Sequence, residues 1–166
     1  MNTTLSNDKF EELKKIGLAR LRAKYNDSGS ARITFNNRYD QKQTDEDVDL
    51  SGIVSEFAVA DYLGLALDTS ISARGDDGND LKDDRTIQVK STKYPTGKLL
   101  FDNFGKFVSD VAFLVIVSPD FKTTRIAGWI SKQDFLAKAQ TKDFGYGSRV
   151  FVSQSELNSA DTFKGK

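Results

Sequence analysis

The stretch Gly78–Thr92, which reads GNDLKDDRTIQVKST, decides the fold of this chain. Its last seven residues alternate polar and apolar side chains, which is the period of a half-buried β-strand. Ile87 and Val89 fall on one side of that strand. Gln88 and Lys90 project together from the opposite face, because side chains two residues apart share a side. The strand therefore has one apolar face that can pack against a core and one polar face whose side chains can bind a ligand or contact solvent.

A short antiparallel strand is predicted just before this one. The Asp83-Asp84 connection is short enough to let residues 80–82 fold back against the main strand. Asp80 then lies near the plane of Gln88 and Lys90. A carboxylate, an amide oxygen and an ammonium group at one point can hold a hard divalent cation and stabilise a charged transition state.

The order of these residues resembles that of the metal-dependent nucleases with the PD-(D/E)XK motif, also called restriction-endonuclease-like proteins. Asp80 matches the aspartate of the motif, and Gln88-Val89-Lys90 matches its E-x-K element in the Q-x-K variant. Upstream, Gly52–Gly64 resembles the first core helix of the family, with Glu56 as its glutamate. Downstream, residues 111–118 and 124–130 resemble the strands that complete the sheet.

The resemblance covers about residues 50–158 and implies a fold. We expect an α/β protein with a mixed central sheet of four to five strands flanked by helices. Residues 1–166 would form a single nuclease-like domain, in which residues 1–49 are an N-terminal extension made of a helix and an acidic loop.

The resemblance also implies a cofactor and a role for each site residue. Mg²⁺ (or Mn²⁺) would be held by Asp80, Gln88, Glu56 and the backbone carbonyl of Val89. Lys90 would complete the catalytic set by stabilising the charge that develops on the phosphate or by orienting the attacking water. A glutamine in place of the family's glutamate removes one negative charge, which should weaken metal binding and leaves the number of metal ions open.

Each of these residues also has a purely structural interpretation. Asp80 stands among several turn-forming aspartates, of which Asp77 is its main rival. Gln88 and Lys90 fit the solvated face of an edge strand. Glu56 falls on a helix face of small and apolar residues, where a buried carboxylate needs a partner such as lysine or arginine.

The residues after the motif suggest contacts with nucleic acid. Ser91, Thr92, Lys93 and Lys98 carry hydroxyl and ammonium groups that can position a phosphate backbone without reading its sequence. A polar loop is the alternative. Several large aromatic residues are expected in the core rather than as stacking platforms for bases: Phe113, Phe121, Trp129 and Phe135.

Composition narrows the chemistry. The chain has no histidine, which excludes His-based general bases and His-ligated zinc or iron, so any metal must be held by oxygen ligands. It has no cysteine, which excludes disulfides and thiolate chemistry and fits a cytosolic protein. Its 24 basic and 24 acidic residues cancel, which counts against a nucleic-acid binder that acts through overall charge but not against one with segregated charge.

The remaining pattern predicts the other elements. Helices are expected over residues 8–25, 50–63 (closed by Gly64) and 131–139, and residues 36–49 are expected to form a loop. Strands are expected over residues 31–35, 67–72, 80–82, 86–92, 111–117, 124–130 and 149–152, and residues 99–101 are expected to form either a strand or a loop.

These observations together predict a Mg²⁺-dependent deoxyribonuclease that hydrolyses the phosphodiester bonds of DNA. The form of the substrate stays open among resolvase-like, exonucleolytic and other cleavage, as does a homodimer. One alternative is a catalytically inactive nuclease-like protein that binds DNA or inhibits a partner. The other is an interaction domain whose acidic loop, residues 40–49, binds a basic partner. The polar N-terminus and the lack of an apolar run near ~18 residues predict no membrane partner and a cytoplasmic location, in the host cytoplasm if the chain is phage-encoded.

Overall fold

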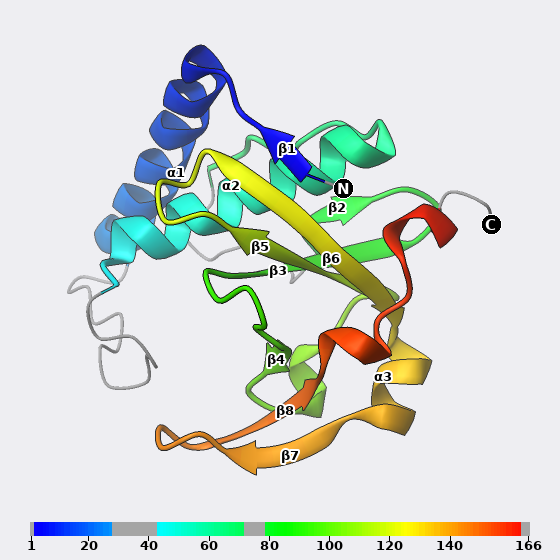
Figure 1. Ribbon diagram of the computed structural model, residues 1–166. Coiled ribbons are helices and arrows are strands. Elements are labelled where there is room, and N and C mark those ends of the chain that lie inside the picture. Colours follow the sequence, from blue (N-terminus) through cyan, green and yellow to red (C-terminus); the bar gives the residue numbers. More distant parts are fainter. Residues whose placement is uncertain (1, 28–42, 72–78, 164–166) are drawn as a thin grey trace.

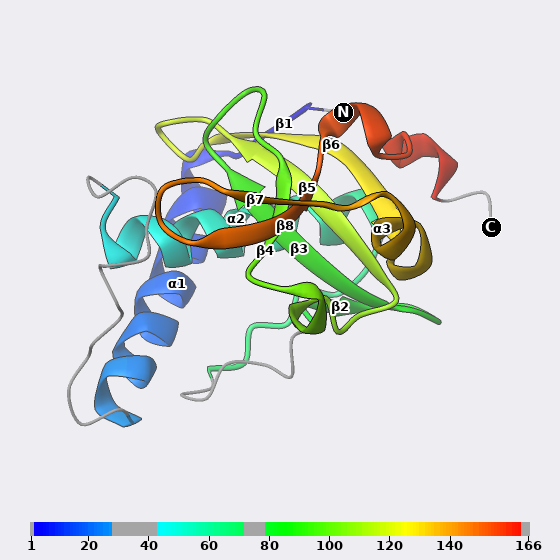
Figure 2. The ribbon, with the colours of Figure 1, turned by 90° about the horizontal axis from the view of Figure 1, so that it is seen from below.

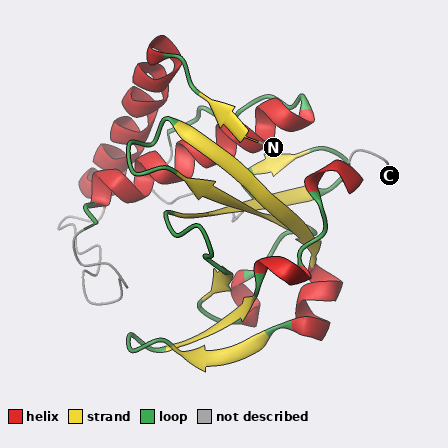
Figure 3. Ribbon diagram, viewed as in Figure 1, coloured by secondary structure: helices red, strands yellow, loops and turns green. Residues whose placement is uncertain are grey.

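The computed structural model describes residues 2–27, 43–71 and 79–163 and contains two β-sheets with helices around them (Figure 3). In chain order the strands are β1 (Asn2–Thr4), β2 (Leu81–Lys82), β3 (Thr86–Thr92), β4 (Leu99–Phe101), β5 (Val111–Val117), β6 (Thr123–Ser131), β7 (Gln140–Asp143) and β8 (Ser148–Val152). The helices are α1 (Asn7–Asp27), α2 (Asp45–Leu63), α3 (Lys132–Lys138) and the short 3₁₀ turns η2 (Phe104–Lys106), η3 (Gln154–Glu156) and η4 (Ala160–Thr162).

The larger sheet has five strands in the order β1-β6-β5-β3-β2. It is a mixed sheet, because β3 and β5 run parallel whereas β2 with β3, β5 with β6 and β1 with β6 are antiparallel. A crossover that contains β4 and η2 joins the two parallel strands. The smaller sheet has the order β4-β8-β7. The expected mixed α/β sheet of four to five strands is thus confirmed, whereas the second sheet was not expected.

The two faces of the five-stranded sheet are covered by different layers. The helices α1 and α2 lie over one face, and the smaller sheet with α3 lies over the other (Figures 1 and 2). The seven residues of β5 are all buried because both faces are covered, as its continuous apolar run predicts. Its odd-numbered residues join the core beneath the helices, together with Ile87, whereas Ala112, Leu114 and Ile116 join the core beneath the smaller sheet.

The helix ends follow local sequence signals. The Ser6 hydroxyl accepts a hydrogen bond from the Lys9 amide at 3.2 Å at the start of α1. Gly64 closes α2 with φ +70°, the left-handed conformation that glycine adopts without strain. The Ser131 hydroxyl accepts from the Asp134 amide at 3.0 Å at the start of α3, as its sequence predicts.

The acidic run at residues 45–49 opens α2, so the expectation that it belongs to a loop is wrong. Thr44 and Asp47 form a capping box: the Thr44 hydroxyl accepts from the Asp47 amide at 3.1 Å, and the Asp47 carboxylate accepts from the Thr44 amide at 3.0 Å. Three acidic residues in the first turn also interact favourably with the helix dipole. The acidic composition here marks a helix N-terminus.

The strand expected over residues 67–72 is absent from its described part, residues 67–71. The Asp68 carboxylate accepts a hydrogen bond from the Ser70 amide at 2.8 Å, and the Asp68 carbonyl accepts one from Arg20 at 2.7 Å. A local turn and a helix side chain therefore use the polar groups that a strand would present to a neighbour. The strand expected over residues 31–35 and the rival aspartate at position 77 lie outside the described residues.

No helix in the described part of the chain has both the length and the apolar character needed to cross a membrane.

Candidate active site

The hairpin of β2 and β3 brings Asp80 against the motif strand. Leu81 pairs with Ile87, so continuing the ladder by one step sets Asp80 across from Gln88. The Asp80 amide donates to the Ile87 carbonyl at 2.9 Å. One Asp80 carboxylate oxygen accepts a hydrogen bond from the Val89 amide at 2.5 Å. The predicted fold-back of residues 80–82 is confirmed, and the Asp80 carboxylate lies at the strand that bears the Q-x-K element.

The Val89 carbonyl faces the same edge as the Asp80 carboxylate. Backbone groups of alternate residues in a strand point toward the same neighbouring strand. The Ile87 carbonyl and the Val89 amide both point toward β2, so the Val89 carbonyl does as well. Since β2 comprises only two residues, the Asp80 side chain occupies the position where the ladder would otherwise continue. The Asp80 carboxylate and the Val89 carbonyl therefore lie at the same edge of the sheet, just beyond the end of β2.

Gln88 is buried on the face that the smaller sheet covers, which excludes the alternative of a solvated glutamine on an edge strand. The residue is 6% exposed, although β2 pairs only with Thr86 and Ile87 and leaves the rest of β3 at the edge of the sheet. The side-chain nitrogen donates to the Lys106 carbonyl at 3.3 Å. Within the described part of the chain, Oε1 of the same amide is buried and has no hydrogen-bond partner. An unpaired buried acceptor is costly, so a bound cation or water that paired with this oxygen would remove that cost.

Lys90 shares the polar face of β3 with Gln88. The two residues line one cavity of about 360 Å³ between the two sheets, which Phe101, Lys106 and Arg149 also line. The Lys90 ammonium lies 5.2 Å from the centre of the Phe101 ring, a cation–π arrangement that supports the charge without a carboxylate. The amide and the ammonium of the motif therefore face the same space, as the alternation of the strand predicts.

Glu56 lies on the other side of the sheet. It belongs to α2, is 8% exposed, and accepts a hydrogen bond from Arg20 of α1 at 2.9 Å. The helix packs against the apolar face of β3, where the Ser51 hydroxyl donates to the Ser91 hydroxyl at 2.9 Å. The structure thus pairs Glu56 with an arginine, as expected for a buried glutamate, and separates it from the face that carries Gln88 and Lys90.

The four residues expected to contact nucleic acid line a second cavity, of about 480 Å³. We call this cavity the lysine groove; its lining includes Ser91, Thr92, Lys93 and Lys98, together with Lys90. Lys90 lines both cavities and therefore stands where they meet. The described residues that line the groove include three lysines and no carboxylate. None of these lysines forms an ion pair with a carboxylate in the described part of the chain.

One wall of the lysine groove is the turn that follows β3. Gln154 donates hydrogen bonds to the carbonyls of Pro95 and Gly97 at 2.9 and 2.8 Å, and Arg125 donates to Pro95 at 3.2 Å. A side chain at position 97 would meet Thr92 at 2.4 Å, so glycine lets this turn close against the end of β3. These contacts hold the lysine side chains of the turn on a fixed backbone.

The start of β3 is held by hydrogen bonds that also perturb two carboxyl groups. The Asp110 carboxylate accepts from the Thr86 amide and hydroxyl, each at 2.8 Å, and these bonds lower the pKa of Asp110. Partial burial raises the pKa of Asp83, but the side-chain and backbone hydrogen bonds from Arg85 outweigh that effect and bring it below its ordinary value. Both carboxylates stabilise the hairpin in their ionised form.

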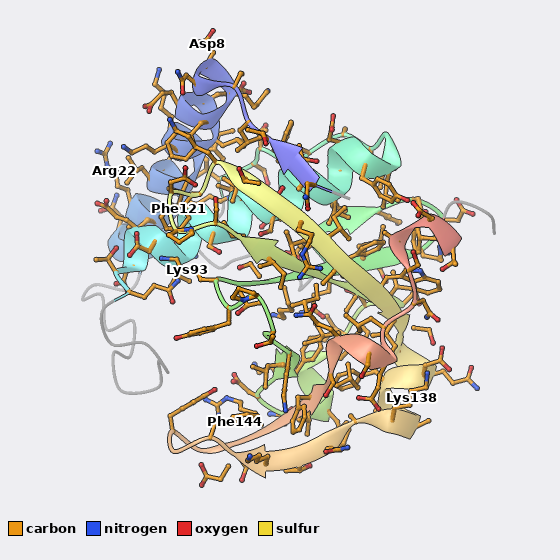
Figure 4. The ribbon with its side chains drawn as sticks, in the orientation of Figure 1. Asp8, Arg22, Lys93, Phe121, Lys138 and Phe144 are labelled. Carbon is orange, nitrogen blue, oxygen red and sulfur yellow. The ribbon has the colours of Figure 1, made fainter. Side chains whose placement is uncertain are left out.

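Several residues around the two cavities were not predicted from the sequence. Phe144 and Tyr146, from the turn between β7 and β8, line the lysine groove. Phe144 and Lys93 lie on the same side of the molecule, at that turn and at the end of β3 (Figure 4). Arg149 lines the smaller cavity and is ion-paired with Asp102 at 3.0 Å. The strand β7 is exposed along its whole length, so no apolar alternation signalled the hairpin that carries these residues.

The donor set at the site is poor in carboxylates. Within residues 2–27, 43–71 and 79–163, no group of three or more acidic side chains that could hold a metal ion is found. Any cation at the motif would therefore combine the Asp80 carboxylate with neutral oxygens of Gln88 and Val89. These are hard oxygen donors of the kind that Mg²⁺ and Mn²⁺ accept.

The fold defines an α/β protein with a mixed five-stranded sheet and a smaller sheet packed on one face. Comparison with models of protein families, with curated proteins and with solved structures finds no match in any of the three.

Proposed function

We propose that this chain is a metal-dependent nuclease that hydrolyses the phosphodiester bonds of DNA on a restriction-endonuclease-like fold. The order of α2, the β2–β3 hairpin and the strands β5 and β6 agrees with the elements of that family. The observation that carries the proposal is the contact between the Asp80 carboxylate and the Val89 amide, at 2.5 Å. It sets the motif aspartate beside the strand that presents Gln88 and Lys90.

The oxygen donors at this point suit Mg²⁺ or Mn²⁺. The Asp80 carboxylate and the Val89 carbonyl share one edge, and the buried Oε1 of Gln88 has no partner among the described residues. The ion would supply positive charge against the scissile phosphate and acidify the attacking water. Glu56 is not required in this set, because its carboxylate neutralises Arg20.

Lys90 would provide a fixed positive charge next to Gln88, with which it lines one cavity. Its ammonium has no carboxylate partner in the described part of the chain and lines both the smaller cavity, which Gln88 also lines, and the lysine groove. A preorganised cation stabilises the negative charge that grows on the phosphate in the transition state. Lys93 and Lys98 would hold the flanking phosphates.

Incubation with linear, circular, single-stranded and branched DNA, in Mg²⁺ and in EDTA, tests the proposal. The wild-type chain should cleave at least one of these forms in Mg²⁺ and none in EDTA, and Asp80→Asn should abolish the cleavage. Mg²⁺-dependent cleavage that survives in the Asp80→Asn variant would refute the assignment of the site.

A nucleic-acid-binding protein without catalysis is the second candidate. It is favoured by the glutamine at position 88, whose nitrogen is already bonded to the Lys106 carbonyl, and by the ion pair of Glu56 with Arg20. Such a protein would bind DNA through the lysine groove equally well in Mg²⁺ and in EDTA. The same incubations would then give no cleavage of any form.

A further inference from the structure

The turn between β7 and β8 brings two aromatic side chains to the lysine groove. Phe144 and Tyr146 both line the groove, as does the turn that follows β3. Their ring centres are 6.1 Å apart and the ring planes differ by 28°, an offset stacked pair. A third aromatic residue that lines the groove, Tyr94, is 46% exposed. The groove therefore combines aromatic surface with three lysines.

The backbone of this turn fixes the positions of the two rings. Gly145 and Gly147 on either side of Tyr146 have φ +92° and +105°, which residues with a side chain rarely adopt. The guanidinium of Arg149 lies 5.1 Å from the centre of the Tyr146 ring and is itself held by Asp102. The ring of Phe144 packs edge-on against Phe151 at 5.5 Å. These contacts hold the aromatic pair at the wall of the groove before any ligand arrives.

The lysines of the groove are also positioned without neutralising partners. The Lys98 ammonium lies 4.2 Å from the centre of the Phe151 ring, and the Lys93 ammonium lies 4.4 Å from that of Phe121. Aromatic rings orient these cations but leave their full charge. The groove is large enough for a small-molecule-sized group, since ligand pockets commonly measure about 300–1,000 Å³.

We propose that the lysine groove binds single-stranded DNA, with bases stacked on Phe144 and Tyr146 and phosphates held by Lys93 and Lys98. Aromatic surfaces interleaved with cations are the general means of holding single strands, because every base has a stacking face and every nucleotide has a phosphate. In a duplex the bases are stacked on one another and cannot reach these rings. The inference rests on the proposed function and deepens it: the nuclease acts on single-stranded or unpaired segments, which the groove leads to Lys90.

A merely structural role for the aromatic pair makes a different prediction. If Phe144 served only to pack the β7–β8 hairpin against Phe151, its replacement would lower the melting temperature and leave DNA binding unchanged. The test therefore needs a binding measurement on folded protein together with a melting curve.

Fluorescence anisotropy in EDTA, where no cleavage occurs, measures the binding directly. The probes are a short fluorescein-labelled oligothymidylate, an abasic strand of the same length and a duplex of the same length. The wild-type chain should bind the oligothymidylate more tightly than either of the other probes. Phe144→Leu should weaken binding of the oligothymidylate about 10-fold and leave binding of the abasic strand unchanged.

Two further variants serve as controls. Phe144→Tyr keeps an aromatic face and should restore the affinity lost in Phe144→Leu. Phe104→Leu removes an exposed aromatic residue, 41% exposed, on η2 and outside the groove, and should not change the affinity. Equal affinity of wild type and Phe144→Leu for the oligothymidylate, or tighter binding of the duplex, would overturn the inference.

The outcome separates this inference from the proposed function. If the chain binds the single strand through Phe144 but cleaves no DNA in Mg²⁺, the lysine groove still binds single-stranded DNA and the proposed nuclease activity is rejected. Cleavage that depends on Asp80 but not on Phe144, with duplex preferred, would keep the nuclease and reject the single-strand groove.

Discussion

Helix α1 and the lysine groove both collect cations, but the surroundings of these cations differ. Three cations of the helix form ion pairs: Lys9 with Glu12, Arg20 with Glu56, and Lys24 with Asp49. The lysines of the groove lie over aromatic rings instead, and none of them forms an ion pair in the described part of the chain. The ion-paired cations of α1 stabilise the fold, whereas the lysines of the groove remain available to an anionic ligand.

The difference shows why a net charge of zero is a poor guide to partners. Some of the acidic residues that offset the basic ones act within the helices. Asp47 caps the start of α2, and Asp49 forms an ion pair with Lys24 of α1. The lysines around the motif keep their charge. Acidic side chains therefore neutralise the cations of the helix but not those of the groove. A chain with a net charge of zero still has a cationic groove.

Removal of Lys90 should have the largest effect on activity. Lys90→Ala should lower the rate of DNA cleavage in Mg²⁺ about 100-fold or more, because a fixed charge next to the developing charge is lost. The melting temperature should change little, since the ammonium has no ion-pair partner among the described residues. Lys9→Ala, which removes an exposed cation of α1, is the matched control and should cleave at the wild-type rate. Equal rates for the two variants would contradict this account.

The other lysines of the groove should act on binding rather than on chemistry. The double variant Lys93→Ala with Lys98→Ala should lower affinity for single-stranded DNA and reduce the slope of log affinity against log salt by about 1.4, or about 0.7 for each phosphate contact. Titrations at several salt concentrations in EDTA measure the slope. An unchanged slope would mean that the groove does not hold the phosphates.

Loss of a paired helix cation should act on stability instead. Arg20→Ala leaves the Glu56 side chain, 11% exposed, without its arginine and should lower the free energy of unfolding by about 1–3 kcal/mol. Urea denaturation gives the value. The double variant Arg20→Ala with Glu56→Ala should recover part of it, because no buried charge then remains unpaired. DNA affinity should stay at the wild-type level, and a loss of affinity without loss of stability would contradict the comparison.

The smallest effect is expected in acid, at the start of β3. Hydrogen bonds from Thr86 lower the pKa of Asp110 below its ordinary value of 3.8. A lowered pKa in the folded state gives stability that is present above 3.8 and is lost as the pH falls through the folded value. Asp110→Asn removes this contribution, so its melting temperature should fall less than that of wild type below pH 3.8. Parallel acid profiles for the two proteins would exclude the effect.

Elements whose signals are local were predictable from the sequence. The strand β3 was predicted to the residue because its alternation is strict, and β5 because its apolar run is continuous. The start of α2 lies five residues before the predicted one although its signal is local, because the Thr44–Asp47 capping box lies within an acidic run whose composition is also typical of a loop. The exposed strand β7 gave no signal.

The sequence predicts which site residues lie close together within the hairpin. It does not predict how deeply each of them is buried or which residues they contact from elsewhere in the chain. The spacing predicts that Asp80 lies next to the strand of Gln88 and Lys90, and its contact with the Val89 amide agrees, because a hairpin determines it locally. The burial of Gln88 depends on the smaller sheet and on the Lys106 carbonyl, which the sequence of β3 cannot reveal. The partner of Glu56 lies 36 residues away on another helix. Long-range packing decided both environments.

Binding of Mn²⁺, followed by electron paramagnetic resonance, tests most directly whether the oxygens of Asp80, Gln88 and Val89 form a cation site. The wild-type chain should bind Mn²⁺, and Asp80→Ala should lose that binding. Lys90→Ala should still bind the ion, because the lysine is not a ligand, and yet cleave DNA about 100-fold or more slowly than wild type. Equal Mn²⁺ binding by wild type and Asp80→Ala, or no binding by wild type, would contradict the proposed site.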